Sequence, residues 1–147
     1  LIVLIMRYRK TISSIQLKQR EDRIIPFAIA SFFYLLTYLF IKKLTVPAII
    51  IDMFFGLSLS VFTVFFITFK HKISAHMTGI SGLIGAFLGF QLIFQANLSS
   101  WLVLLVIIWG MLGAARLQLK AHSNTEIVTG SLVGFSAILL PIIAGWG

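Results

Sequence analysis

The sequence predicts an all-α protein, a polytopic transmembrane helix bundle with five complete spans plus the end of a sixth at the N-terminus. The first observation is composition: 59% of the 147 residues are hydrophobic and 11% are charged, whereas soluble domains carry about 25% charged residues. The second is length, because the apolar stretches reach the roughly 20 residues that a helix needs to cross the hydrocarbon core. The third is the lack of the alternating pattern of a barrel strand, which leaves helices to satisfy the backbone in lipid.

Charged clusters divide the chain into the spans of a single transmembrane domain, residues 1–147. We interpret residues 1–7 as the remnant of a first membrane helix. The complete spans are expected at residues 24–41, 46–69, 73–94, 101–115 and 124–147. Pro47 suits the first turn of the second of these, where proline is tolerated. Asn124 or Thr125 is expected to cap the last.

Small residues four positions apart mark three of the expected helices. Such pairs let membrane helices approach each other closely. The pairs are Gly85 and Gly89, Gly110 and Ala114, and Gly130 and Gly134. They predict a compact bundle and carry no information about its chemistry.

The charge balance narrows the class of partner. The formal net charge is +8, which can attract nucleic acid, but the chain has no soluble basic domain, so we expect no nucleic-acid partner. Anionic lipid headgroups and the bilayer itself are the expected partners. The absence of cysteine excludes disulfides and thiolate metal sites.

Because successive spans alternate in direction, three polar segments are expected on the same side of the membrane. These segments are residues 7–23, 70–76 and 116–126. All three histidines lie in them: His71, His76 and His122. The positive-inside rule accounts for lysines and arginines on one face, but it does not account for the histidines. We therefore expect a site assembled from polar segments at this face.

The basic residues also bear on sidedness. Every Lys and Arg except Lys42 and Lys43 belongs to the histidine side. By the positive-inside rule this bias places the histidine side in the cytoplasm.

The segment 116–126 carries the first set of candidate site residues. His122 and Glu126 are four positions apart, so on a helix they share one face and can form a hydrogen bond. A carboxylate on one ring nitrogen fixes the imidazole tautomer and leaves the other nitrogen free to attack or to accept a proton. Arg116 adds a planar fork of donors that suits a phosphate. The alternative interpretation is a solvated loop whose charges have no joint role.

The segment 72–79 carries the second set. Ser74 is expected at the N-cap of the following helix, where free backbone N–H groups and the positive end of the helix dipole face the same side. His76 in the first turn can donate a proton to a group held there. A single histidine at the start of a helix is more often structural, and the case for His76 rests on His122 at the same face.

These residues resemble motifs of a known family. Ala115 and Arg116 are followed after five residues by His122 and after three more by Glu126. This pattern is similar to the third motif of the type-2 phosphatidic acid phosphatase superfamily, the integral-membrane lipid phosphatases related to vanadium haloperoxidases. That motif has Ser-Arg, His and Asp at the same spacing. Ala115 and Glu126 therefore depart from it in residue type but not in position.

The other two motifs of the family match less closely. Residues 73–76, Ile-Ser-Ala-His, resemble its second motif, Pro-Ser-Gly-His, and keep both polar members. The first motif is Lys, six residues, Arg-Pro. The nearest residues here are Lys18, Arg23 and Pro26, which do not reproduce that spacing. The resemblance covers residues from about 18 to 134.

The resemblance implies a role for each matched residue. His122 would attack phosphorus and form a phosphohistidine, Glu126 would orient it, and His76 would protonate the leaving group. The phosphoryl oxygens would be bound by Arg116, Ser74, Lys18 and Arg23. A histidine nucleophile needs no metal, so neither a metal nor another cofactor is expected.

The resulting prediction is an integral-membrane lipid phosphatase that hydrolyses a phosphomonoester or diphosphate of a membrane lipid, either phosphatidate-like or polyprenyl diphosphate. The resemblance implies a multi-pass protein of the bacterial inner membrane. Many bacterial members act on the outer face of that membrane, opposite to the side that the basic residues favour.

Two alternatives remain open at this point. One is a non-catalytic relative that acts as a lipid-binding or structural membrane subunit. The other is a small transporter or channel, suggested by Asp52, because a carboxylate inside a span often marks an ion pathway. A structural role for Asp52, paired with a snorkelling Lys43, competes with the transport interpretation.

Overall fold

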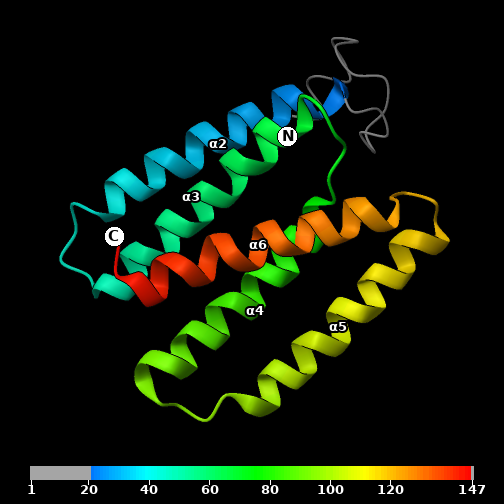
Figure 1. Cartoon of the computed structure of the whole chain (residues 1–147). Coiled ribbons are helices and arrows are strands. Elements are labelled where there is room, and N and C mark those ends of the chain that lie inside the picture. The colour runs from blue at the N-terminus through cyan, green and yellow to red at the C-terminus, as the bar shows by residue number, and fades with distance from the viewer. Residues whose placement is uncertain (1–20, 147) are drawn as a thin grey trace.

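The computed structural model describes residues 21–146, and this part of the chain forms helices and no strands (Figure 1). The helices are α2 Glu21–Ile41, α3 Ala48–Thr68, α4 Ala75–Phe94, α5 Ser99–Gln118 and α6 Asn124–Ala144. All five are long and apolar enough to cross a membrane. The prediction of an all-α bundle with five complete spans is therefore confirmed, and the chain is a multi-pass membrane protein. Residues 1–7, the expected end of a sixth span, lie outside the described residues.

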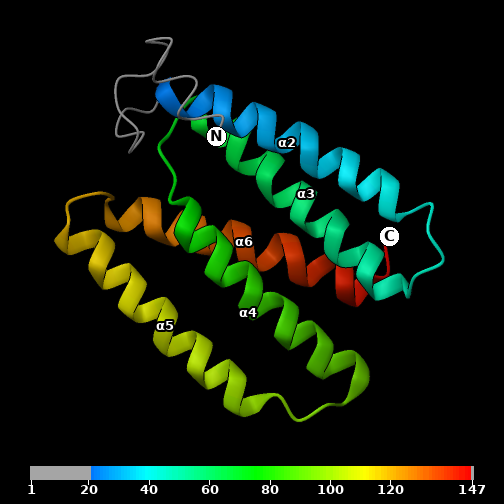
Figure 2. The same ribbon diagram turned by 180° about the vertical axis from the view of Figure 1, so that it is seen from behind.

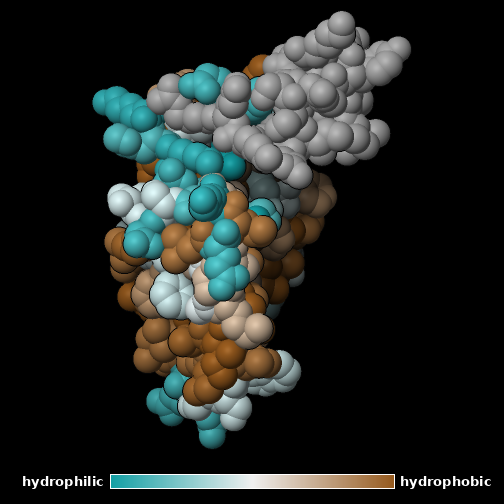
Figure 3. Space-filling view, turned by 90° about the vertical axis from the view of Figure 1, so that its right-hand side faces the viewer, coloured by the Kyte–Doolittle hydropathy of each residue, from teal (hydrophilic) through white to brown (hydrophobic). Residues whose placement is uncertain are grey.

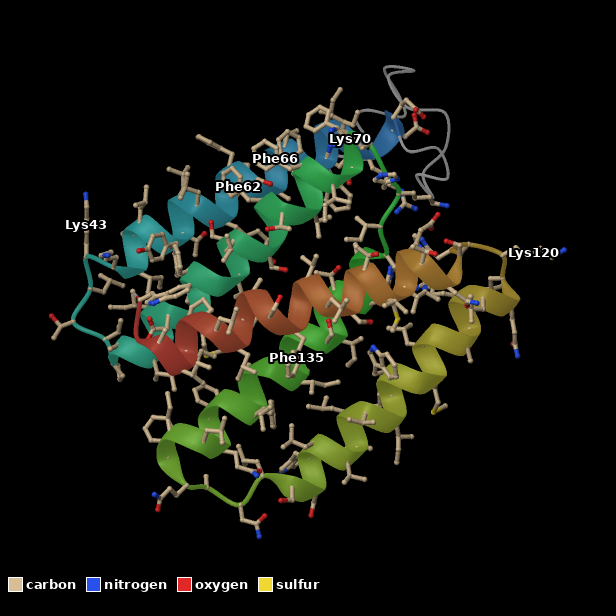
Figure 4. All side chains as sticks on the ribbon, in the orientation of Figure 1. Lys43, Phe62, Phe66, Lys70, Lys120 and Phe135 are labelled. Atoms are coloured by element: carbon tan, nitrogen blue, oxygen red, sulfur yellow. The ribbon has the colours of Figure 1, made fainter. Side chains whose placement is uncertain are left out.

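The surface of the bundle agrees with a membrane environment. On the face shown in Figure 3, hydrophobic side chains form a broad band, and most of the hydrophilic side chains lie at its two ends. Lys70 and Lys120 lie toward one end of the bundle, whereas Lys43 lies at the opposite end (Figure 4). This arrangement is the alternation of spans that the sequence predicts. We refer to the end with Lys70 and Lys120 as the polar end.

Helix α6 lies in the middle of the bundle and holds it together (Figures 1 and 2). It packs against α4 and α3, while α2 packs against α3 and α5 packs against α4. Helices α3 and α4 make little direct contact with each other. A hydrogen bond of 2.8 Å from Trp109 Nε1 to Ser131 Oγ joins α5 to α6.

Glycines make the contact between α4 and α6 possible. A Cβ on Gly134 would lie 1.9 Å from the Thr78 carbonyl oxygen, and a Cβ on Gly130 would lie 2.7 Å from the Ser74 carbonyl oxygen. A Cβ on Gly85 would lie 2.7 Å from a backbone oxygen of α6. The two backbones thus approach more closely than any larger residue allows, as expected for small residues in membrane helices.

The sequence predicts a similar close contact at Gly110 and Ala114, but the structure differs there. Among the described residues, no atom outside the local helix backbone lies within 4 Å of a Cβ built on Gly110. The pair on α5 therefore mediates no close approach between the described helices, because spacing alone does not decide which face of a helix meets a neighbour.

Several helix boundaries also differ from the prediction. Ser123, rather than Asn124 or Thr125, is the N-cap of α6, and its side chain accepts a hydrogen bond from the Glu126 N–H. Helix α5 extends to Gln118, so Arg116 lies in its last turn rather than in a loop. Helix α4 begins at Ala75 directly after the N-cap residue Ser74, as the sequence predicts.

Candidate active site

A cavity of about 800 Å³ opens at the polar end, where α2 and α4 begin and α5 ends. Its walls come from α2, the α3–α4 connection, α4, α5 and the α5–α6 loop. The lining residues are Arg23, Phe27, Lys72, Ala75, His76, Arg116, Leu119, Lys120, Ala121 and His122. Segments that are far apart in the sequence therefore meet around one space, which we call the polar cavity.

The start of α6 positions His122 against Glu126. The Ser123 side chain caps the helix through the Glu126 N–H at 3.3 Å, so the first turn of α6 is fixed beside His122. His122 Nδ1 lies 2.6 Å from Glu126 Oε2, and the His122 side chain is 4% exposed. A carboxylate can only accept a hydrogen bond. Nδ1 is therefore the nitrogen that donates, and Nε2 keeps the lone pair.

The surroundings of His122 favour the neutral ring. Burial lowers the pKa of His122 below its ordinary value, and the positive charges of Arg23 and Lys72 lower it as well. The hydrogen bond that the ring donates to Glu126, together with the negative charge of that carboxylate, raises the pKa and offsets part of this effect. A neutral imidazole with a free lone pair is the form that attacks phosphorus or accepts a proton.

His76 approaches the polar cavity from another helix. It lies in the first turn of α4, two residues after the N-cap Ser74, and it lines the same space as His122. Arg116 and Arg23 line the same space. The polar cavity thus holds two imidazoles in different surroundings, one buried and bonded to a carboxylate and the other exposed among cations.

Two arginines that are far apart in the sequence line the polar cavity. Arg23 Nη1 donates a hydrogen bond of 3.1 Å to the Ile73 carbonyl oxygen, which directs its side chain toward the start of α4. Arg116 Nε is buried and has no hydrogen-bond partner among the described residues. A buried donor without a partner is costly unless a ligand satisfies it, and a guanidinium suits phosphate oxygens in particular.

The lining carries strong positive charge. Arg23, Lys72, Arg116 and Lys120 contribute four cations, and none of the described lining residues is acidic. Lys120 adopts a left-handed backbone conformation, φ 48°, in the α5–α6 loop. Electrostatics therefore favour an anionic ligand here.

Two further hydrogen bonds connect the segment before α4 to the segment around His122. Lys72 Nζ donates to the Ala121 carbonyl oxygen at 2.7 Å, and the Ser74 N–H donates to the Glu126 carbonyl oxygen at 3.3 Å. The segment before His76 thus holds the carbonyl groups of Ala121 and Glu126, which lie before and after His122 in the chain. This geometry keeps the two halves of the site in register.

The structure does not bring every predicted residue to the polar cavity. Ser74 is fully buried against Gly130 of α6, and it is not among the lining residues. Its Oγ has no hydrogen-bond partner within residues 21–146. Lys18 lies outside the described residues. Arg23, His76, Arg116 and His122 do line the same cavity, and Glu126 lies behind His122.

Lys72, Lys120 and Phe27 line the polar cavity although sequence reasoning did not select them. From the sequence, the positive-inside rule explains Lys72 and Lys120 as part of the general basic bias of this side. Their positions beside the second and third motifs are the sequence feature that could have identified them as lining residues. Phe27 lies within the first turns of α2 and carried no signal beyond its apolar character.

In chemical terms the arrangement can bind a phosphate and act on it without a cysteine. The cations can neutralise phosphoryl oxygens, one imidazole can attack, and the other can exchange a proton with the leaving group. Within the described part of the chain, no group of three or more His, Asp or Glu side chains is placed to hold a metal ion. No protein-family model matches the chain, and no curated protein or solved structure matches it either.

Proposed function

We propose that this protein is an integral-membrane phosphatase that hydrolyses a phosphomonoester or diphosphate of a membrane lipid, in the manner of the type-2 phosphatidic acid phosphatases that its motifs resemble. One observation carries the proposal. His122, bonded through Nδ1 to Glu126, lines the same cationic cavity as His76. A bilayer-embedded site of this kind meets phosphorylated lipids at the headgroup level.

The proposed reaction has two steps. In the first, His122 Nε2 forms a bond to phosphorus, the bond from phosphorus to the leaving oxygen breaks, and His76 delivers a proton to that oxygen. In the second, water attacks phosphorus, His76 takes a proton from the water, and the phosphorus–nitrogen bond breaks to release phosphate and restore His122. Arg116 and Arg23 bind the nonbridging oxygens throughout, because charge neutralisation and in-line positioning supply most of the catalysis in phosphoryl transfer.

The residues that depart from the family motifs fit this scheme in part. Glu126 has one methylene more than the aspartate of the motif and still reaches His122 Nδ1. Arg23 does not match the spacing of the first motif, yet it lines the polar cavity. As part of the same proposal, we assign the protein to the bacterial inner membrane.

The direct test is release of phosphate from a panel of lipid phosphates by purified protein in detergent, with a chelator present. The panel contains phosphatidate and a polyprenyl diphosphate. His122→Ala should abolish the release, and His76→Ala should lower it by roughly 10²–10⁴-fold, the usual contribution of a general acid. His71→Ala is the matched control, because His71 is exposed and does not line the cavity.

The two histidine roles can be separated with a better leaving group. A nitrophenyl phosphate needs little protonation as it departs, so His76→Ala should recover much of its lost rate on that substrate, while His122→Ala should not. Undiminished release by His122→Ala would rule out the mechanism. Binding of lipid phosphate without any release by the native protein would instead favour the non-catalytic lipid-binding alternative.

A further inference from the structure

A second cavity, of about 370 Å³, lies between the pair α2–α3 and helix α4. Helices α3 and α4 make little direct contact there, and the side chains around the space are almost all apolar. The lining residues are Phe27, Tyr34, Met53, Leu57, Ser60, Val61, Val64, Ala75, Thr78, Gly79, Gly82, Leu83, Ala86 and Ile138. We call this space the apolar groove.

The apolar groove adjoins the polar cavity. Phe27 and Ala75 belong to the lining of both, so one space begins where the other ends. A single molecule that occupies both must carry an anionic group at one end and a hydrocarbon chain at the other. A lipid phosphate has this chemistry.

The length of the apolar groove matches one leaflet of a bilayer. Along α4 its lining runs from Ala75 beside the polar cavity to Ala86. At 1.5 Å of rise per residue this distance is roughly 16 Å, which is about half of the ~30 Å hydrocarbon thickness. When the phosphate of a lipid lies at the membrane surface, the end of its hydrocarbon chain lies near the middle of the bilayer. The far end of the groove reaches the same depth.

We infer that the apolar groove holds the hydrocarbon chain of the lipid whose phosphate lies in the polar cavity, and that it selects substrates by their chain. The inference rests on the proposed function and extends it to substrate recognition. Because the surrounding bilayer is as apolar as the groove, the groove adds little affinity. Its role is to give the chain a path that lets the phosphate reach His122, and an obstruction of that path should exclude long chains while leaving short ones unaffected.

Gly79 offers a way to close the apolar groove without disturbing the fold. It lines the groove, and among residues 21–146 no atom outside the local helix backbone lies within 4 Å of a Cβ built on it. Gly110 on α5 is the matched control, since its Cβ position is equally open and it does not line the groove. Gly79→Phe and Gly110→Phe therefore make the same change at a groove position and at another exposed helix position.

The test compares hexadecyl phosphate with butyl phosphate as substrates in phosphatidylcholine nanodiscs. Gly79→Phe should lower kcat/KM for hexadecyl phosphate by about tenfold or more, the scale of steric discrimination in an apolar pocket. It should change kcat/KM for butyl phosphate by less than about twofold, well below the scale of steric discrimination in an apolar pocket. Gly110→Phe should alter neither. Equal losses on both substrates, no loss on either, or the same losses in Gly110→Phe would overturn the inference.

A binding measurement keeps this test independent of the proposed reaction. A hexadecyl phosphate with a photoreactive diazirine in mid-chain should label α3 and α4 residues of the apolar groove in native protein and in Gly110→Phe, but not in Gly79→Phe. This labelling requires no turnover. If no variant releases phosphate while groove labelling persists, the proposed reaction fails and the lipid site stands. Labelling spread evenly over the lipid-facing surfaces of the helices would refute the site itself.

Discussion

His122 is the residue on which the local chemistry converges. Its Nδ1 is bonded to Glu126, its ring is nearly buried, and the charges of Arg23 and Lys72 act on it. Each of these contacts changes the free energy of the protonated ring relative to the neutral ring. The pH dependence of the proposed activity should therefore report on these contacts of His122.

The first prediction concerns the acid limb of the pH profile of kcat/KM. In the proposed reaction His122 must be neutral to attack, and burial lowers its pKa, so the limb should lie below about 6.5, the ordinary value for histidine. Glu126→Gln removes the carboxylate that raises this pKa. The limb should then move to still lower pH, and kcat should fall on the order of a hundredfold as the ring loses its orientation.

Glu126→Asp is the control for that change, since it keeps the carboxylate that the family motif has at this position. Its limb should stay near that of the native protein. A limb above about 6.5 in the native protein would contradict the assignment of His122 as the attacking group. The same lowered pKa makes the folded protein less stable as the pH falls below about 6.5, because the unfolded chain then binds more protons than the folded one.

The second prediction concerns Lys72, which we expect to act as a positioning residue. Lys72→Met removes the hydrogen bond to the Ala121 carbonyl oxygen and a positive charge that lowers the pKa of His122. The rate should fall by about tenfold, the scale of one hydrogen bond from a charged group, and the acid limb should move to higher pH. Lys72→Arg keeps the charge, so its limb should stay in place. A role in folding alone would leave the limb of Lys72→Met unchanged.

At the scale of the helices, the contact between α4 and α6 decides whether the site exists. Gly130 and Gly134 let α6 approach the first turns of α4. That approach holds the Ser74 N–H against the Glu126 carbonyl oxygen. The two motif segments are therefore aligned by a backbone contact at which no larger side chain fits.

The third prediction follows from this contact. Gly134→Ala places a Cβ 1.9 Å from the Thr78 carbonyl oxygen, so the two helices must move apart. The free energy of unfolding should fall by about 1–3 kcal/mol or more, measured as a lower Tm in detergent. Gly110→Ala is the control, because its Cβ would meet no other helix or side chain of the described residues within 4 Å, and it should leave Tm unchanged or raise it slightly. Equal Tm values for the two variants would contradict the role of the α4–α6 contact.

At the scale of the whole molecule, the question is which side of the membrane the polar end faces. The bundle places Lys120 and Lys43 at opposite ends (Figure 4). The basic residues favour the cytoplasm for the end with Lys120, whereas the resembled family often acts on the outer face. Lipids are present in both leaflets, so the proposed reaction with a lipid phosphate is compatible with either side.

The fourth prediction is that positions 43 and 120 are labelled from opposite sides. The chain has no cysteine, so Lys43→Cys and Lys120→Cys each create a single reactive thiol. A membrane-impermeant maleimide added to intact cells should label one of the two variants, and the other should react only after the membrane is opened. Labelling of both variants in intact cells would contradict the alternation of the spans.

The sequence by itself determined the class of the protein and the positions of its spans, because hydrophobicity and charge act locally along each helix. It also predicted the contact between His122 and Glu126, although His122 makes that contact from just before the N-cap residue Ser123 and not from a turn of α6. Spacing could not determine which face of a helix meets a neighbour, and this is why Gly110 was expected in a contact that it does not make.

Only the tertiary structure decided how the local pieces combine. It brought Arg23 beside the motif residues despite the unmatched spacing, added Lys72 to the polar cavity, and buried Ser74 against α6. It also joined an apolar groove to a cationic cavity at Phe27 and Ala75. These outcomes depend on how closely α4 and α6 approach and how far α3 and α4 diverge, and such distances arise from packing between segments that are remote in the chain.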